Sequence, residues 1–114
     1  MIQWHDTQYG DPNRPSVLFL HGFLGSGADW RPVVEGLQNT CRSVCVDLPG
    51  HERTPLPAES EPLTMESCAA DLIARLDALY IPRCALAGYS MGGRLALYLA
   101  LTYPDRFDRV LLES

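Results

Sequence analysis

The sequence contains no lysine, since all nine of its positively charged side chains are arginines. No residue can therefore form a Schiff base with a carbonyl substrate or serve as the lysine of a phosphate-binding loop. Positive charge is scarce overall: the formal net charge is −5 and the sequence pI is about 5.0. Because nucleic-acid binding depends on clustered cations that neutralise phosphates, we predict no nucleic-acid partner.

Long apolar runs are also lacking. No uncharged stretch reaches the roughly 18 residues that a membrane-spanning helix needs. The residues after Met1 show neither the positive leader nor the apolar segment of a secretory signal. We therefore expect no membrane partner and a cytoplasmic location.

Cysteine pairs of the Cys-x-x-Cys type are absent, although the sequence has four cysteines. Such spacings argue against zinc sites and against thioredoxin-like chemistry, so we predict no metal site. Without a recognisable secretory signal, reduced thiols are expected rather than a disulfide framework. The cysteines are Cys41, Cys45, Cys68 and Cys84.

What is present is the composition of a globular domain. The chain has 114 residues, of which 46% are hydrophobic and 20% charged, enough for one domain with a buried core. Short apolar runs, most of them ending at glycine or proline, are typical of strands buried on both faces. They cover residues 16–20, 43–48, 83–87 and 109–112, and a weaker alternation over residues 2–9 suggests an earlier strand.

Helical periodicity fills the segments between these runs. Residues 64–80 place apolar side chains at the spacing of an amphipathic helix. A short helix is predicted over residues 29–37 with Asp29 as its N-cap, and residues 90–103 are apolar on nearly all sides, which predicts a helix buried at the centre. The alternation of strands and helices predicts the α/β class, with a mostly parallel sheet and helices on both faces.

The sequence Gly88-Tyr89-Ser90-Met91-Gly92 lies between a predicted strand and a predicted helix. In that context the Gly-x-Ser-x-Gly pattern predicts a nucleophile elbow, a strained turn that holds the serine hydroxyl at the carboxyl end of the strand. The glycines are needed because a Cβ atom at either position would collide with the neighbouring strand or helix. The alternative is an ordinary helix start capped by Ser90.

A glycine-rich loop, residues 21–27, follows the first core strand. It reaches the carboxyl edge of the sheet, where ligands of open α/β sheets bind. Beside a nucleophile, the backbone N–H groups of Phe23 and Met91 would stabilise a developing oxyanion. The alternative is a plain flexible turn. We interpret His21 as a residue that orders this loop through hydrogen bonds, not as a base.

Arg94 follows Ser90 by four residues, which places it one turn further along the same helix face. A guanidinium there can bind a carboxylate through two hydrogen bonds, which an enzyme acting on neutral esters does not need. The pattern therefore predicts a small-molecule carboxylate substrate. A structural salt bridge to a neighbouring carboxylate is the alternative.

The segments 21–23, 47–51 and 88–94, in this order, resemble the amino-terminal half of an α/β-hydrolase fold protein. Together with residues 103–107 and 110–114, the run Gly-Tyr-Ser-Met-Gly-Gly-Arg is most similar to the 2-succinyl-6-hydroxy-2,4-cyclohexadiene-1-carboxylate synthases of menaquinone biosynthesis. That resemblance implies elimination of pyruvate from a polyanionic substrate, started by a triad serine, with no metal and no organic cofactor.

The resemblance also implies the role of each site residue. Ser90 would be the triad serine, and Phe23 and Met91 would supply the oxyanion hole. Arg94 would hold a substrate carboxylate, and Tyr89 would line the substrate pocket.

Two departures from the family pattern stand out. Glu52 replaces the usual glycine after Pro-Gly-His, which costs about 1 kcal/mol if that position has a positive φ. The chain is also shorter than its family, in which the triad acid and then the histidine follow the serine, whereas all three histidines here precede Ser90. Residues 1–114 are thus predicted to be the amino-terminal part of a single α/β-hydrolase domain, without the later strands, the acid, the base and the lid.

Three functional hypotheses stay open at this point. The first is the synthase, and the second is a carboxylesterase or carbon–carbon bond hydrolase of the same fold. An esterase of neutral substrates would tolerate Arg94→Ala, whereas the synthase would lose most of its activity. The third is a non-catalytic half-domain whose exposed sheet edge is covered by a partner, including a second copy of the chain. The oligomeric state separates the third hypothesis from the other two.

Overall fold

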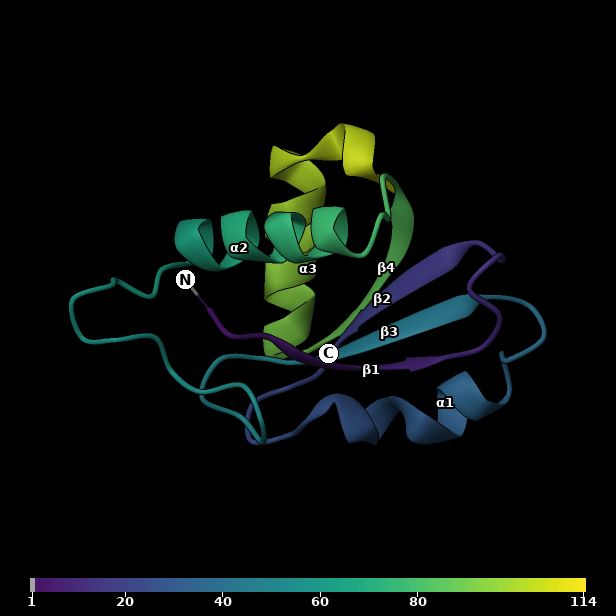
Figure 1. The fold of residues 1–114 in the computed structure, drawn as a ribbon, viewed down its shortest axis with the longest axis horizontal. Coiled ribbons are helices and arrows are strands. Elements are labelled where there is room, and N and C mark those ends of the chain that lie inside the picture. Colours follow the sequence, from purple (N-terminus) through teal and green to yellow (C-terminus); the bar gives the residue numbers. More distant parts are fainter. Residues whose placement is uncertain (1) are drawn as a thin grey trace.

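A computed structural model describes residues 2–114, which form one five-stranded sheet (Figure 1). The strands are β1 (His5–Tyr9), β2 (Ser16–Leu20), β3 (Arg42–Asp47), β4 (Cys84–Tyr89) and β5 (Phe107–Glu113). Their order in the sheet is β1-β3-β2-β4-β5, and β1 alone runs antiparallel to its neighbour. The predicted α/β class and the mostly parallel sheet are confirmed. The edges of the sheet are β1 and β5.

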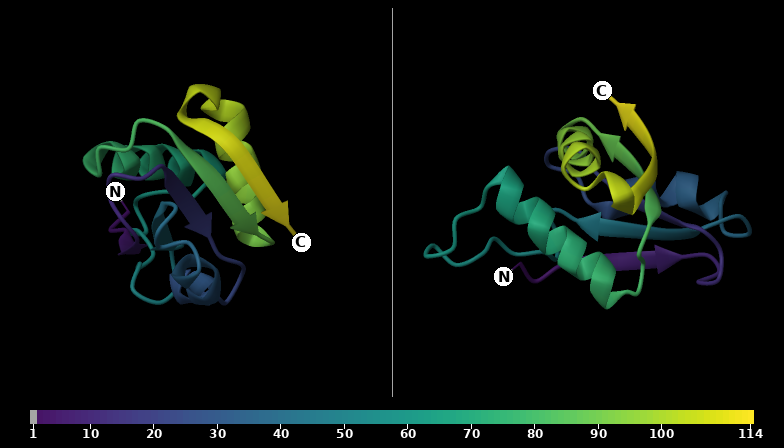
Figure 2. Two further views of the ribbon diagram at one scale, coloured as in Figure 1. Left: turned by 90° about the vertical axis from the view of Figure 1, so that its right-hand side faces the viewer. Right: turned by 90° about the horizontal axis from the view of Figure 1, so that it is seen from above.

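Helices cover both faces of the sheet, as predicted (Figures 1 and 2). One face carries a 3-10 turn, η1 (Gly27–Trp30), followed by α1 (Arg31–Glu35). The other face carries α2 (Met65–Ala78) and α3 (Met91–Thr102), and a second 3-10 turn, η2 (Pro104–Arg106), leads into β5.

The predicted helix over residues 29–37 is wrong in its start and its cap. The chain first forms η1, and Ser26 is the cap, because its hydroxyl accepts a hydrogen bond from the Ala28 N–H at 3.2 Å. Asp29 instead belongs to the first turn, where its carboxylate accepts from the Ser26 N–H at 3.2 Å. This reciprocal pair satisfies backbone N–H groups that a helix start leaves without partners.

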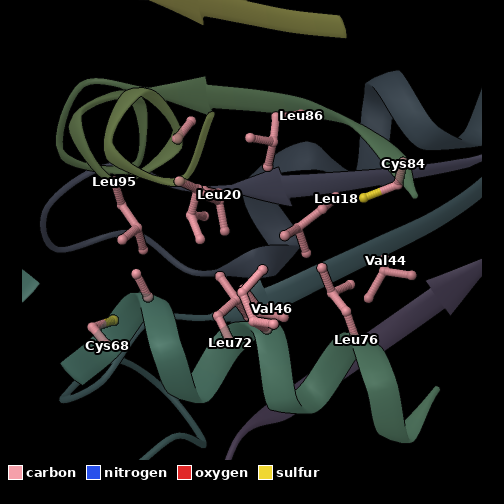
Figure 3. Close-up of a cluster of buried hydrophobic side chains, with 14 of the residues drawn as sticks. Leu18, Leu20, Val44, Val46, Cys68, Leu72, Leu76, Cys84, Leu86 and Leu95 are labelled. Atoms are coloured by element: carbon pink, nitrogen blue, oxygen red, sulfur yellow. The ribbon is translucent and has the colours of Figure 1, made fainter. Parts of the chain in front are cut away.

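The amphipathic helix predicted over residues 64–80 is α2. Thr64 caps it, since its hydroxyl accepts from the Ser67 N–H while the Ser67 hydroxyl accepts from the Thr64 N–H, each at 2.9 Å. The buried stripe of α2 packs on the apolar side chains of β2 and β3 (Figure 3). From α2 these are Cys68, Leu72 and Leu76, and from the strands Leu18, Leu20, Val44 and Val46.

The prediction that residues 90–103 are buried at the centre is wrong for one side of α3. Leu95, Ala96 and Leu99 are buried, but Leu97 and Leu101 are exposed. The reason is that α3 packs against β4, β5 and α2, and no element within residues 2–114 covers its outer side.

All four cysteines are buried free thiols, as predicted. Burial raises the pKa of Cys45 and of Cys84 to about 12, and that of Cys68 to about 11. These thiols stay protonated at neutral pH and are therefore poor nucleophiles. No helix among the described residues is long and apolar enough to cross a membrane.

Candidate active site

Ser90 occupies a strained turn between β4 and α3. Its backbone has φ 53° and ψ −110°, and its hydroxyl makes no capping hydrogen bond to the helix that follows. A serine that caps a helix has extended backbone angles and accepts a bond from the first turn, so the geometry is not that of an ordinary cap. Strain of this kind costs about 1–3 kcal/mol and persists only where the surrounding structure imposes it.

Here the strain is imposed by the close packing of β4, α3 and the end of β2, which the neighbouring glycines allow. A Cβ atom on Gly88 would lie 2.6 Å from the Gly92 carbonyl oxygen and 2.7 Å from the Gly93 Cα. A Cβ atom on Gly92 would lie 2.5 Å from the His21 carbonyl oxygen and would also overlap the carbonyl oxygen of Leu20. Only glycine lets β4, α3 and the end of β2 approach so closely.

The loop of residues 21–27 lies directly against this turn. A Cβ atom on Gly22 would lie 2.8 Å from the Tyr89 ring and 3.5 Å from the Ser90 Cβ. Phe23 follows with an exposed side chain. Within the described part of the chain, neither the Phe23 N–H nor the Met91 N–H donates a hydrogen bond. Both predicted oxyanion donors thus lack an acceptor among the described residues. Phe23 directly follows Gly22, and Met91 directly follows Ser90.

His21 links the loops that follow β2 and β3. Its Nε2 accepts from the Leu48 N–H at 2.9 Å and its Nδ1 lies 2.7 Å from the Gly22 carbonyl oxygen, which fixes the neutral ring with the proton on Nδ1. Burial lowers the pKa of His21, and the nearby His51 ring lowers it further. The interpretation of His21 as a loop-ordering residue is confirmed.

A pH dependence of stability follows from this pKa. In the unfolded chain His21 has its ordinary pKa of 6.5, and in the folded protein the pKa is lower. Between the two values the unfolded chain binds more protons, so the free energy of unfolding is highest above pH 6.5 and falls as the pH drops below it. The free energy of unfolding should fall by about 1.4 kcal/mol per pH unit at most.

His21→Gln provides the control, because its amide oxygen can still accept from Leu48 but does not titrate. We expect urea unfolding, followed by circular dichroism, to show a smaller loss of stability between neutral and mildly acidic pH in His21→Gln than in the parent chain. An equal loss of stability in both proteins would show that His21 is not the group responsible for the pH dependence.

Asp47 and His51 hold the same loops in place. The sequence indicated them only as part of the 47–51 motif and gave neither a role in the site. The buried Asp47 carboxylate accepts from the Gly27 N–H at 2.8 Å and the Arg53 N–H at 3.3 Å. His51 Nε2 accepts from the Leu24 N–H at 3.0 Å. The signal that could have indicated Asp47 is a carboxylate closing an otherwise apolar strand run. Its distant partners were not visible in the sequence.

Glu52 has a φ of 43°, so the position that departs from the family pattern does lie in the left-handed region.

His51 Nδ1 lies 3.1 Å from the Pro49 carbonyl oxygen, so both of its ring nitrogens are engaged. No side chain of residues 2–114 hydrogen-bonds the Ser90 hydroxyl. The described chain therefore presents a serine without a paired base.

Arg94 shares a cavity with Ser90. The Arg94 N–H donates to the Ser90 carbonyl oxygen at 3.1 Å, one helical turn back. Both residues line a cavity of about 420 Å³, together with Leu97, Leu112 and Glu113. The alternative of a structural salt bridge is not observed, because Arg94 forms no ion pair with any described residue. Its guanidinium is therefore available to an anionic ligand.

Tyr89 does not line the cavity that Ser90 and Arg94 share, although Glu113 borders both that cavity and the one beside Tyr89. It lines a different cavity, of about 260 Å³, with Gly22 and Trp30. Beside Met91 is a third cavity of about 180 Å³, whose walls are largely apolar and include Leu63 and Leu95. The turn at Ser90 thus has beside it one cavity lined by the positively charged Arg94 and another whose walls suit an apolar group.

A mostly parallel sheet, a strained serine between strand and helix, and a glycine-rich loop beside it are the architecture of the α/β-hydrolase class. Residues 15–114 match the family model described as the alpha/beta hydrolase fold. The chain belongs to the α/β-hydrolase fold family.

Individual relatives agree with this placement. The chain is 38% identical over 99 residues to a putative 2-succinyl-6-hydroxy-2,4-cyclohexadiene-1-carboxylate synthase of Bacillus subtilis, an alignment covering 87% of this chain and 36% of that protein. It is 35% identical over 120 residues to the chloroplastic protein PHYLLO of Arabidopsis thaliana, covering 99% of this chain and 7% of the other. An epoxide hydrolase from Vigna radiata superposes with a TM-score of 0.91 at 29% identity, covering 99% and 36%. The chain spans less than half the length of each of these proteins.

Proposed function

We propose that this chain carries the serine and carboxylate-binding part of a 2-succinyl-6-hydroxy-2,4-cyclohexadiene-1-carboxylate synthase active site. The observation that carries the proposal is the position of Arg94, unpaired among the described residues and lining the same cavity as Ser90. A cation beside the nucleophile suits a polyanionic substrate. The identity with the putative Bacillus subtilis synthase supports the same substrate class.

In this mechanism the residues have separate tasks. Arg94 would bind a substrate carboxylate through two hydrogen bonds and so orient the ring against Ser90. The Ser90 oxygen would take a proton from a ring carbon, and the electron pair of that C–H bond would form a ring double bond while the C–O bond to the leaving group breaks. The group would leave as the enolate of pyruvate, which takes up a proton to become pyruvate. The N–H groups of Phe23 and Met91 would bind the substrate oxygen on which negative charge develops.

Ser90 needs a base for this step, because a free hydroxyl is a weak proton acceptor at neutral pH. His21 and His51 are engaged in holding the loops, as described above. We propose that the base and its acid belong to polypeptide outside residues 1–114, in keeping with an amino-terminal part of a single domain.

A hydrolase of neutral esters or of carbon–carbon bonds is the second candidate. It is favoured by the apolar cavity beside Met91, which could take an uncharged acyl or alkyl group. An enzyme that acts on neutral esters gains nothing from the Arg94 cation. Arg94 therefore separates the two candidates.

Binding of 2-succinylbenzoate, an aromatic analogue with two carboxylates, tests the proposal on the 114-residue chain itself. We expect calorimetry to show that Arg94→Ala weakens binding about tenfold, the effect of one exposed charge-assisted contact. Arg83→Ala is the matched control, because Arg83 is likewise exposed but lies at the opposite end of β4. Circular dichroism verifies that both variants fold.

Two results would count against the synthase. One is equal affinity of the parent chain and Arg94→Ala for 2-succinylbenzoate. The other is equal affinity of the parent chain for the dicarboxylate and for its dimethyl ester, which would favour the hydrolase.

A further inference from the structure

The loop after β2 contains a tight turn at the predicted oxyanion hole. The Gly25 N–H donates to the Gly22 carbonyl oxygen at 3.1 Å, so Phe23 and Leu24 are the two central residues of a β-turn. Leu24 has a φ of 65°, whereas Phe23 is not among the residues with a positive φ. A turn with a positive φ at its third residue alone is a type II turn.

Leucine is an unfavourable residue at the third position of this turn. A type II turn favours glycine or asparagine there, because a side chain at positive φ crowds the backbone. Side-chain packing among the described residues does not explain the conformation, since Leu24 is 81% exposed. The turn is therefore stabilised by a contact of its backbone.

His51 supplies that contact from the neighbouring loop. The loops after β2 and β3 leave the same end of the sheet, because these two strands are parallel neighbours (Figure 1). His51 Nε2 accepts from the Leu24 N–H at 3.0 Å, and the Phe23 ring packs edge-on against the imidazole with 5.9 Å between the ring centroids. The Leu24 N–H belongs to the planar central peptide group of the turn, so this hydrogen bond fixes which way that group faces.

Type I and type II turns differ by a rotation of this central peptide group. In a type I turn the third residue has a φ of about −90°, which most residues adopt. The rotation would turn the Leu24 N–H away from His51 and bring the Phe23 carbonyl oxygen toward the imidazole. His51 Nε2, which accepts a hydrogen bond here, would then face a second acceptor. The hydrogen bond to His51 therefore favours type II over type I.

We propose that His51 is a positioning residue for the oxyanion hole. It holds the Phe23–Leu24 peptide group in the type II orientation and so fixes the backbone on the carboxyl side of the Phe23 N–H. On the amino side, the Gly22 carbonyl oxygen lies 2.7 Å from His21 Nδ1, and a planar trans peptide points its N–H away from its carbonyl. Both peptide groups that meet at Phe23 are thus held by a histidine.

The consequence for the reaction rests on the proposed function, in which the Phe23 N–H binds a developing oxyanion. Such a donor is most effective when it and the neighbouring dipoles are oriented before the charge appears. Turning the Phe23–Leu24 group over would reverse the peptide dipole next to this donor. His51 also lines the cavity beside Met91, the residue of the second predicted donor. It therefore borders the residues of both predicted donors.

Two substitutions separate the hydrogen bond from the packing of the ring. His51→Phe keeps an aromatic ring but has no acceptor, whereas His51→Gln has no ring but offers an amide oxygen near the place of Nε2. Both are made in the 114-residue chain and studied by NMR. In a type II turn the Leu24 amide proton lies close to the Phe23 Hα, and in a type I turn it lies close to the Phe23 amide proton.

We expect the nuclear Overhauser contacts of a type II turn in the parent chain and in His51→Gln, and those of a type I turn in His51→Phe. Hydrogen exchange of the Leu24 amide should become about tenfold faster in His51→Phe, because its acceptor is gone. His5→Phe is the matched control, since His5 is also half-buried and its ring makes no hydrogen bond within the described chain. It should leave the signals of Phe23 and Leu24 unchanged.

A type I pattern in the parent chain would overturn the proposal, and so would a type II pattern in His51→Phe. A type I pattern in His51→Gln would overturn it too, because the ring and not the acceptor would then hold the turn. If His51→Phe fails to fold by circular dichroism, the parent chain still decides. The measurement is the scalar coupling across the hydrogen bond between the Leu24 nitrogen and His51 Nε2, and its absence would overturn the proposal.

Titration with 2-succinylbenzoate separates a failure of this inference from a failure of the proposed function. When the ligand binds, the Phe23 amide signal should shift in the parent chain and in His51→Gln, and should shift less in His51→Phe. A Phe23 signal that the bound ligand leaves unmoved would overturn the oxyanion role of this N–H. The turn signals need no ligand, so they report on His51 even where Arg94→Ala leaves the binding of 2-succinylbenzoate unchanged.

Discussion

Gly92→Ala is expected to lower the free energy of unfolding by about 3 kcal/mol or more. The added methyl group would meet the carbonyl oxygens of Leu20 and His21, which belong to the backbone and cannot rotate away. Relief requires α3 to move off the end of β2, which would separate the elbow from the loop that carries Phe23. The measurement is urea unfolding followed by circular dichroism, and loss of the cooperative transition would be the extreme form of the same result.

Gly36→Ala is the matched control for this prediction. Gly36 has an ordinary φ of −76°, and a Cβ atom there would approach only the Val33 carbonyl oxygen, at 3.4 Å. Replacing glycine by alanine at such a position should leave stability within about 0.5 kcal/mol or raise it, because the unfolded chain loses freedom. If Gly92→Ala were as mild as Gly36→Ala, the close approach of α3 and β2 would not be a constraint on the fold.

Ser90→Gly is expected to stabilise the protein by about 2 kcal/mol, since it removes the strain of a side chain at φ 53° and ψ −110°. Ser90→Ala removes the hydroxyl but keeps the Cβ atom, so its stability should stay close to that of the parent chain. The comparison separates backbone strain from the contribution of the hydroxyl group.

The same two variants link strain to function. Proteins commonly tolerate strained backbone at functional sites, where selection for activity outweighs stability. If unfolding measurements gave Ser90→Gly no more stability than Ser90→Ala, the turn would hold no strain and this argument for a nucleophile position would fail.

Much of the fold was predictable because it depends on local sequence. The strands end near the glycines and prolines that stop the apolar runs, and α2 follows the spacing of its buried residues. The short segment after residue 26 was less predictable, because a reciprocal bond between Ser26 and Asp29 decides between a 3-10 turn and a helix cap. The exposed side of α3 was mispredicted, since an apolar sequence does not say which neighbours are there to cover it.

The candidate site divides in the same way. The turn at Ser90 and the place of Arg94 one helical turn later follow from spacing along the chain. The partners of Asp47 and His51 do not, because Gly27 and Leu24 come from a different strand connection. Likewise, no pattern in the sequence separates the cavity of Tyr89 from that of Arg94.

By itself, the sequence determined the α/β class, the strained turn at Ser90 and the place of Arg94 one helical turn later, because backbone angles, glycine placement and helix periodicity are local properties. Only the tertiary structure decided that His21 joins two loops through both ring nitrogens and that Arg94 has no carboxylate partner among the described residues. These features depend on the order β1-β3-β2-β4-β5, which brings distant segments side by side and leaves β5 at the edge. Strand order is set by the packing of the whole chain, so no window of sequence contains it.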